Sequence, residues 1–288
     1  MKFPIASTLA FAGLAQAWYK GLNIGGNLPN GACRSQADFL RAFNTMKSLP
    51  PQFNVARLFA SSDCNTLLNA VPAALQAGVR LLPGIWTQDD AHYGREKQAM
   101  LDAIAAHPNW LDWMVGVSVG SEDLYRKEVP ASSIASKIYD VRGMLRSKGV
   151  TSWVGHVDTW NAWTDPANTE VIKACDWIGT DQYPYWQGAT IQQAPGVFWA
   201  AVDAVRNRVR DVKPNTPIWV TETGWAVAGK SFGASTASIP NAQAFWRNTA
   251  CPAFPQIDVF YYAYSEQGSD PDFSILDGND RPLFDLSC

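Results

Sequence analysis

Eight short, almost continuously apolar runs recur along the chain, and stretches with the 3.6-residue periodicity of amphipathic helices separate most of them. An apolar run of this length fits a strand that is buried on both faces, as in a parallel sheet. The predicted strands are 19–25, 54–59, 79–86, 113–120, 152–158, 177–183, 218–222 and 258–264. The predicted helices include 66–77, 96–106, 132–148, 198–212 and 241–249. This order predicts an α/β fold, a (β/α)8 TIM barrel.

The length agrees with one such barrel. A chain of 288 residues has room for two ordinary domains, but a single (β/α)8 barrel typically takes about 250 residues. No linker rich in proline, glycine and serine divides the sequence after residue 17. We therefore expect a single domain over residues 18–288.

The first seventeen residues have the pattern of a secretory signal peptide. A positively charged start and the apolar stretch 5–15 are followed by Ala15-Gln16-Ala17, a cleavage site of the small-x-small type. The apolar stretch is too short to span a membrane, and no later segment offers about 20 apolar residues without charge. We expect residues 1–17 to be removed and the protein to be secreted.

Export to an oxidising compartment permits disulfides, and the chain has five cysteines. Five is an odd number, so one thiol stays free. We favour a bridge between Cys251 and Cys288, the last residue, because it would fix a fraying terminus, and place Cys33 with Cys64 second. Cys175 heads an apolar run, which favours a buried, unreactive thiol.

Charge and spacing argue against several classes of partner. Lysine and arginine number 23 and aspartate and glutamate 26, and no basic run exceeds two residues, so we expect neither a nucleic acid nor a membrane partner. No cysteine or histidine spacing suggests a metal site, and we expect no cofactor. Aromatic residues make up 12% of the chain, with 13 Trp. Such rings suit a sugar-binding cleft, although a large core also uses them.

Two glutamates stand where predicted strands end: Glu122 follows the fourth run and Glu222 ends the seventh. In a (β/α)8 barrel the carboxyl ends of all strands lie on one rim, where strands four and seven face one another. Retaining cleavage of a glycosidic bond uses two carboxyls about 5–5.5 Å apart, one as acid/base and one as nucleophile. A single glutamate at a strand end would more often cap a helix or form a salt bridge. Two such residues among glycines and aromatics favour catalysis.

The segments around these glutamates resemble glycoside hydrolase family 17, the β-1,3-glucanases, in the form found in secreted fungal cell-wall enzymes. Val119-Gly120-Ser121-Glu122 is similar to the acid/base motif and 220–225 to the nucleophile motif. Further matches lie at 19–25, 56–59, 63–65 and 181–185, so the resemblance spans nearly the whole chain after residue 17. Many relatives in the wider clan have Asn in place of Ser121. This departure implies weaker anchoring of the sugar 2-hydroxyl but the same reaction.

The resemblance implies roles for individual residues. Glu122 would be the general acid/base, its pKa raised by a partly apolar site and by the charge of Glu222, the nucleophile. Tyr183 is placed to hydrogen-bond the nucleophile, or equally to be a buried tyrosine with a satisfied hydroxyl. Arg57, inside the second strand, needs a carboxylate partner near the pair. Glu266, after the eighth strand, is placed to meet sugar hydroxyls.

Aromatic residues just past the strand ends are candidates for stacking on glucose rings, and we expect two or three of them in the cleft. They are Trp160, Trp163, Tyr185, Trp186 and Trp225. Asp63, after the second strand, fits an Asx turn or a helix cap as well as a cleft residue. His156 is better explained as a core histidine than as a cleft residue.

Other functions remain as alternatives. Residues 116–120 match the G-x-S-x-G motif of serine esterases, but Ser118 lies within an apolar strand and no histidine follows His156. A non-catalytic protein that binds wall glucan would have no need of both glutamates. We expect an enzyme, a monomer outside the cell or in the cell wall, that cleaves internal bonds of β-1,3-glucan. A β-1,3-glucanosyltransferase is the alternative, since both reactions pass through the same glycosyl-enzyme.

Loop lengths bear on the mode of cleavage. The loops after the second and fourth strands are short, and the helices that follow begin near Thr66 and Pro130. The segment 226–240 is long, and its glycine, serine and alanine predict a flexible flap that does not close the cleft. An open cleft favours endo cleavage with several glucose subsites.

Overall fold

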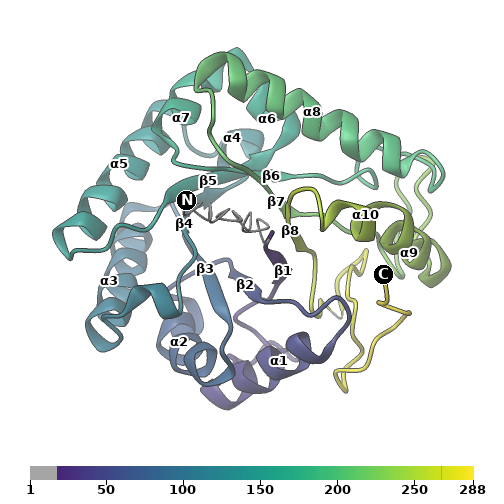
Figure 1. Cartoon of the computed structure of the whole chain (residues 1–288), viewed down its shortest axis with the longest axis horizontal. Coiled ribbons are helices and arrows are strands. Elements are labelled where there is room, and N and C mark those ends of the chain that lie inside the picture. The colour runs from purple at the N-terminus through teal and green to yellow at the C-terminus, as the bar shows by residue number, and fades with distance from the viewer. Residues whose placement is uncertain (1–17, 267) are drawn as a thin grey trace, which may run out of the picture.

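The computed structural model describes residues 18–266 and 268–288, and the predicted signal peptide 1–17 lies outside them. In the described residues, eight parallel strands pair in sequence order, and β8 pairs with β1 to close the barrel. The strands are β1 Lys20–Asn23, β2 Val55–Leu58, β3 Arg80–Ile85, β4 Val117–Ser121, β5 Val154–Thr159, β6 Ile178–Asp181, β7 Ile218–Glu222 and β8 Asp258–Tyr261. Figure 1 shows them at the centre of a ring of helices. The predicted (β/α)8 barrel is confirmed.

Helices cover the outside of the barrel and connect its strands (Figure 1). They are α1 Gln36–Ser48, α2 Thr66–Ala77, α3 Asp90–Ala106, α4 Asp123–Arg126, α5 Ala131–Ser147, α6 Trp160–Thr164, α7 Thr169–Ala174, α8 Ala194–Val212, α9 Ile239–Phe245 and α10 Cys251–Ala253. Beyond β8 the described chain forms no helix, and this last segment contacts both α1 and α9. Arg41 of α1 pairs with Asp280 of this segment at 3.2 Å, and Gln243 of α9 donates to the carbonyl of Asp285 at 2.8 Å.

Aromatic rings fill the amino end of the barrel interior. Trp177 and Trp219 stack with their centroids 4.2 Å apart, and the ring of Phe260 lies 6.3 Å from that of Trp219. Glycine makes room for them: a β-carbon on Gly155 would lie 2.3 Å from the carbonyl oxygen of Trp177. Much of the unusual tryptophan content therefore fills the core, and the polar side chains of the barrel gather at its other end.

Two elements differ from the sequence prediction. The fourth strand begins at Val117, because Trp110–Asp112 forms a 3₁₀ turn and Trp113 is buried, with its indole nitrogen donating to the carbonyl of His107 at 3.0 Å. Helix α1, which the periodicity did not single out, begins after Ser35 in a capping box with Asp38.

The segment 226–240 is held by hydrogen bonds at several points along its length. Val227 donates its backbone N–H to the carbonyl of Asp272 at 2.8 Å, and Asp272 donates back to the carbonyl of Ala228 at 3.0 Å. The Ser235 hydroxyl donates to the carbonyl of Ala189 at 2.7 Å. The prediction of a flexible flap is therefore wrong: backbone pairing to the segment after β8 and to the loop after β6 fixes this part of the rim.

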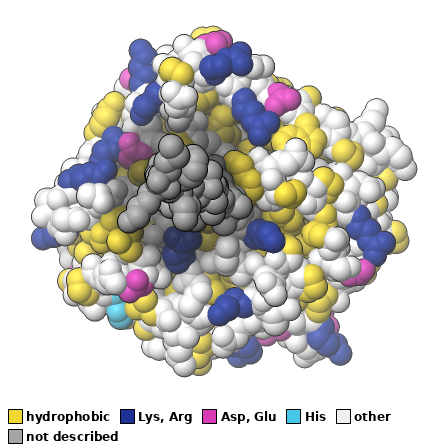
Figure 2. Space-filling model, in the orientation of Figure 1, with side chains coloured by type: hydrophobic (Ala, Val, Ile, Leu, Met, Phe, Trp, Pro, Cys, Tyr) yellow, Lys and Arg dark blue, Asp and Glu magenta, His cyan; other side chains and the backbone are white. Residues whose placement is uncertain are grey.

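No helix in the described ranges is long and apolar enough to cross a membrane. On the face of the molecule seen in Figure 2, lysine and arginine side chains are separated by uncharged ones and do not form a continuous patch.

Both expected disulfides are present in the described part of the chain. Cys251 bridges to Cys288 and Cys33 to Cys64, while Cys175 is free and buried. Burial raises the pKa of the Cys175 thiol to about 12. The expected pairing and the unreactive thiol are confirmed.

This pairing predicts the number of free thiols in the folded protein. Intact-mass analysis after alkylation in denaturant should show one modified cysteine before reduction, Cys175, and five after it. Three modified cysteines before reduction would mean that one bridge does not form, and five that neither does.

Candidate active site

A tight turn at the end of β4 presents Glu122 at the carboxyl rim of the barrel. Glu122 adopts the left-handed conformation, with φ 57°, and its backbone N–H donates to the carbonyl of Val157 on β5 at 2.9 Å. Gly120 also has positive φ, 79°, and a β-carbon there would lie 2.2 Å from the Asp123 carboxylate. The glycine in this motif is thus required for the turn that carries Glu122.

A buried network holds this turn from below. His156 is fully buried, its Nδ1 lies 2.7 Å from the carbonyl of Val119, and its Nε2 lies 3.0 Å from Asp158. A carbonyl only accepts, so Nδ1 carries a proton. Burial by itself lowers the pKa of His156, but the bond to Asp158 and its charge outweigh that effect and raise it. Asp158 in turn accepts from the backbone N–H of Leu124 in α4 at 2.9 Å. The expectation of a core histidine is confirmed.

The carboxylate of Glu222, at the end of β7, is bonded on both oxygens. Nη1 of the buried Arg57 lies 2.5 Å from Oε1, and the Tyr183 hydroxyl donates to Oε2 at 3.0 Å. The same guanidinium donates to Asn23 Oδ1 at 2.8 Å and to Ser121 Oγ at 3.0 Å. The carboxylate partner predicted for Arg57 and the bond predicted for Tyr183 are both confirmed, and Asn23 is a part of the site that the sequence analysis did not name.

Glu122 has the opposite environment. Burial first, and then the charge of Glu222, raise its pKa to about 7, against the lowering effect of Arg126, whose Nη1 lies 2.9 Å from Oε2. The raised pKa predicted for Glu122 is confirmed, with both predicted causes. One carboxyl of the pair therefore exchanges a proton near neutral pH, while the other is held by a buried cation.

A cavity of about 480 Å³ opens beside Glu122. Its lining residues are Glu122, Tyr125, Thr159, Trp160, Asn161, Asp181, Tyr183, Trp186, Gln187 and Phe232. Of the predicted aromatic candidates, Trp160 and Trp186 lie here. Phe232 was missed, because it belongs to the segment whose composition predicted a flap; its ring lies 5.6 Å from that of Trp186.

Three other aromatic candidates do not line this cleft. Tyr185 is buried and its hydroxyl donates to the carbonyl of Lys230. Trp225 is 1% exposed, with its indole nitrogen donating to the carbonyl of Thr236 at 2.9 Å. Trp163 is fully buried. The structure corrects the prediction for these rings, which are buried and present no face to a sugar: Tyr185 and Trp225 support the segment 226–240, and Trp163 donates to the carbonyl of Gly179 at 2.7 Å.

The remaining candidates lie on the same rim or are explained by packing. Glu266 accepts from the Tyr262 hydroxyl, and burial, with a smaller effect of Glu222, raises its pKa. Ser118 is buried in β4 and its hydroxyl donates to the carbonyl of Gly120 at 2.9 Å. It is not at the sharp turn that an esterase nucleophile needs.

Asp63 belongs to a small polar cluster outside the cleft. In the part of the chain that the structure describes, Asp63, His92 and Glu96 are close enough to share a cation. His92 Nε2 lies 2.8 Å from Asp63, and buried Glu96 accepts from the backbone N–H groups of Ser61 at 2.7 Å and Ser62 at 2.8 Å. These bonds tie the loop after β2 to α3 and account for all three side chains.

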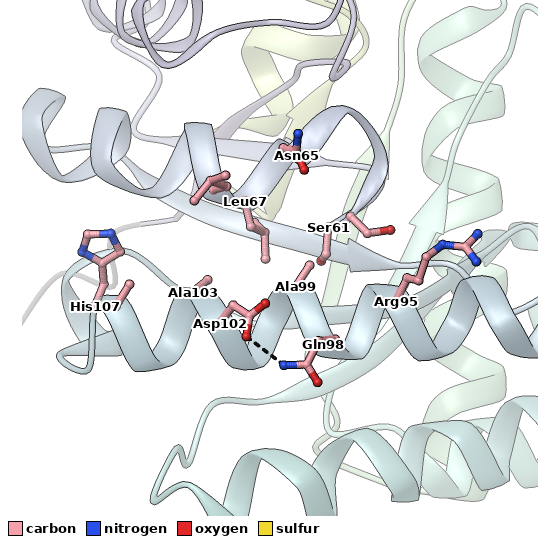
Figure 3. Close-up of a pocket in the computed structure, with 12 residues that line it drawn as sticks. Ser61, Asn65, Leu67, Arg95, Gln98, Ala99, Asp102, Ala103 and His107 are labelled. Atoms are coloured by element: carbon pink, nitrogen blue, oxygen red, sulfur yellow. Dashed lines mark hydrogen bonds between the residues drawn. The ribbon is translucent and has the colours of Figure 1, made fainter.

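A second cavity, of about 280 Å³, lies between α2 and α3 on the side of the barrel (Figure 3). Leu67 of α2 faces the polar edge of α3, where Gln98 donates to Asp102 at 2.8 Å. None of the residues predicted to catalyse lines this cavity. The carboxyl rim is thus the site that brings the predicted residues together.

The sequence of this barrel matches a known family. A model described as the BtgE/BtgC glycoside hydrolase domain covers residues 21–274. The chain belongs to this family. The resemblance to glycoside hydrolase family 17 inferred from the sequence is confirmed by the relatives and solved structures of this BtgE/BtgC domain.

Two relatives of this chain come from fungi. A probable glucan endo-1,3-beta-glucosidase of Aspergillus terreus is 36% identical over 95% of this chain and 61% of its own length. A glucan 1,3-beta-glucosidase of Schizosaccharomyces pombe is 35% identical over 90% of this chain and 83% of its own length. The chain therefore spans less than two thirds of the Aspergillus terreus relative.

Solved structures share the barrel. A glycoside hydrolase family 17 β-1,3-glucanosyltransferase from Rhizomucor miehei is 27% identical, with a TM-score of 0.81, over 95% of this chain and 98% of that one. An active-site mutant of the Rhizomucor miehei enzyme was solved in complex with laminaritriose, and its TM-score is 0.80.

The ion pair on Glu222 predicts a specific cost. Arg57→Met removes a buried cation and leaves Oε1 of Glu222 and Oδ1 of Asn23 without a donor. We therefore expect the free energy of unfolding to fall by about 3–5 kcal/mol. The matched control is Arg41→Met, whose partners Asp38 and Asp280 form an exposed pair, and it should cost about 1 kcal/mol or less. Urea denaturation measures both, and equal losses would contradict a structural role for Arg57.

Proposed function

We propose that this chain is a retaining glycoside hydrolase that cleaves internal β-1,3-glucosidic bonds of glucan. The observation that carries the proposal is the contrast between two carboxyls on one rim. The pKa of Glu122 is raised to about 7, while Glu222 is paired with the buried guanidinium of Arg57. One can hold a proton near neutral pH and the other is an anion, which is the division that retaining cleavage requires.

The two groups act in two steps. First, Glu122 gives its proton to the glycosidic oxygen as the bond to the anomeric carbon breaks, and a carboxylate oxygen of Glu222 attacks that carbon to form a glycosyl-enzyme. Then the Glu122 carboxylate takes a proton from water, and the water oxygen displaces Glu222 from the carbon. Arg57 and Tyr183 bond one carboxylate oxygen each and fix the orientation of Glu222 before the attack.

The cleft and the relatives support β-1,3-glucan as substrate. Trp160 and Trp186 line the cavity beside Glu122 and provide apolar faces for glucose rings. Ser121 keeps a hydroxyl proton free for a sugar while its oxygen accepts from Arg57, and Glu266 lies on the same rim. The named relatives act, according to their names, on glucan 1,3-β-bonds. We expect no useful activity on β-1,4-linked cellulose.

Glucanosyl transfer is the second candidate function, with a specific observation in its favour. Trp186 is 43% exposed and Phe232 47%, side by side in the cleft next to the acid/base. A second sugar bound against these rings would compete with water for the glycosyl-enzyme. The solved family 17 relative from Rhizomucor miehei is named as a glucanosyltransferase.

The same proposal includes the setting in which the enzyme works. We infer a secreted enzyme, outside the cell or in the cell wall, whose residues 1–17 are a signal peptide and whose catalytic domain spans 18–288. The two disulfides support an oxidising compartment. We propose that it acts as a monomer, without a cofactor, and that its partner is the glucan chain.

Substitution of the two glutamates tests the chemistry. Glu222→Ala and Glu122→Ala should each lower laminarin turnover by roughly 10⁴-fold or more without loss of the fold. Azide should restore turnover in Glu222→Ala and yield a glycosyl azide of inverted configuration, because it attacks from the side that the carboxylate left. Glu170→Ala, an exposed glutamate on α7, is the matched control. A near wild-type rate in Glu222→Ala would refute the assignment.

Product analysis tests linkage and outcome. On laminarin we expect oligosaccharides of mixed length early in the reaction and little glucose. With reduced laminari-oligosaccharides, both reactions release a shorter fragment, so products that are all shorter than the substrate indicate hydrolysis, and products longer than the substrate identify transfer. Glucose as the dominant early product would contradict endo cleavage.

A further inference from the structure

We propose that Asp181 keeps a proton while the enzyme works, as a neutral carboxylic acid at the floor of the cleft, and so leaves the Arg57 cation to Glu222. The inference rests on the proposed roles of Glu122 and Glu222 but concerns a third carboxyl that neither step uses. Asp181 ends β6 and lines the same cavity as Glu122 and Tyr183.

The surroundings of Asp181 provide too few donors for an anion. The residue is 2% exposed, and its Oδ1 accepts from the Thr221 hydroxyl at 2.9 Å. Its Oδ2 is buried and has no hydrogen-bond partner among the described residues. An ionised carboxylate offers about four acceptor positions, and burying it with one donor is costly. A protonated carboxyl has less need of donors.

Asp158, on the neighbouring strand β5 and opposite Thr180, shows which donors a buried aspartate anion has in the same protein. It is as deeply buried as Asp181, yet its two oxygens accept from three backbone N–H groups at 2.8 to 3.2 Å. Its Oδ2 also lies 3.0 Å from Nε2 of His156. The two aspartates differ in donor supply and not in depth. That difference assigns the charge to Asp158 and the proton to Asp181.

The charges around Asp181 also favour its protonated form. Glu222 lies opposite it in the register of β6 and β7, and Glu122 lines the same cavity from the end of β4. Arg57, the cation that faces Asp181 from β2, already bonds Glu222, Asn23 and Ser121. On the β5 side Asp181 pairs with Thr159, which is uncharged.

The pKa of Asp181 agrees with this geometry. Burial, and then the negative charges of Glu222 and Glu122, raise it well above its usual value, while Arg57 and the Thr221 bond oppose the shift. The phenol of Tyr183 next to it stays neutral, because burial and the charge of Glu222 raise its pKa also. Among the described residues, the Thr221 hydroxyl is the one group that donates a hydrogen bond to Asp181.

The protonation state of Asp181 affects the two proposed catalytic carboxyls, Glu122 and Glu222. An anion at this position would raise the pKa of Glu122 further and would compete with Glu222 for Arg57. By keeping its proton, Asp181 leaves one buried cation for one nucleophile and lets Glu122 exchange its proton near pH 7. Asp181 is thus a positioning residue, and it acts through the other carboxyls.

Infrared difference spectroscopy tests the protonation state without a substrate. The spectrum of the wild-type protein is compared with that of Asp181→Asn at about pH 8, above the pKa of Glu122. We expect the C=O stretch of a protonated carboxyl in the wild type that is absent from the variant. Loss of carboxylate bands alone would overturn the proposal.

Should Asp181→Asn not fold, Thr221→Val serves instead. This substitution removes the hydroxyl that donates to Asp181, so the protonated C=O band should move to higher wavenumber. No shift of such a band would count against a neutral Asp181.

The pH dependence of laminarin cleavage gives a second readout. Asparagine mimics a neutral carboxyl, so the basic limb of kcat/KM, which follows Glu122, should stay within about 0.3 pH units of its wild-type position. If Asp181 is an anion, its removal lowers the pKa of Glu122, and a limb displaced by about 1 pH unit to lower pH overturns the proposal.

The matched control is the same substitution at Asp158. Asp158→Asn replaces one of the two accepting oxygens with an amide nitrogen that only donates, so at least one backbone N–H loses its acceptor and the Tm should fall by several degrees, whereas Asp181→Asn should not lower it. An equal loss of Tm in both variants would contradict the different charge states. Because the infrared and thermal readouts need no turnover, a protein that fails to cleave laminarin would refute the proposed function and still report on Asp181.

Discussion

A guanidinium group buried at the carboxyl end of the barrel joins four of its strands. Arg57 extends from β2, and its partners come from β1, β4 and β7: Asn23, Ser121 and Glu222. A cation with 2% of its side chain exposed is tolerated only where acceptors surround it. Closure of the barrel brings these strand ends together and so supplies the acceptors that the buried cation needs. The bonds of Arg57 in turn hold the four strand ends in place.

Three carboxyls lie near this cation, and each has different partners. Glu222 is paired with the buried guanidinium and accepts a hydrogen bond from the Tyr183 hydroxyl. Glu122 receives a partly exposed Arg126, which also bonds Glu128, and remains near its protonation midpoint at neutral pH. Asp181 receives one hydroxyl. The rim thus has fewer cations than carboxyls. Which carboxyl is paired with a cation decides which of them is ionised, and the chemistry of the site depends on that difference.

The sequence predicted the parts of this arrangement that depend on position along a strand. Buried parallel strands leave apolar runs of recognisable length, so the residue that ends each run, such as Glu222, could be placed on the rim. The need of Arg57 for a carboxylate followed from charge alone. Orientation could not be predicted: Trp225 and Trp186 both follow strand ends, yet one ring turns into the core and the other into the cleft. The state of Asp181 depends on donors from other strands, which no local pattern records.

In the proposed mechanism, the choice between hydrolysis and transfer does not depend on the two carboxyls, because both reactions use them in the same way. What differs is the molecule that meets the glycosyl-enzyme next to Glu122. There the cleft is bounded by Trp186, from the loop after β6, and by Phe232, from the segment 226–240 that pairs with its neighbours. A ring held in place by backbone hydrogen bonds loses less entropy on binding a sugar than a ring on a free flap would. The anchoring of this segment, which the composition did not reveal, therefore favours a sugar acceptor over water more than an open and flexible rim would.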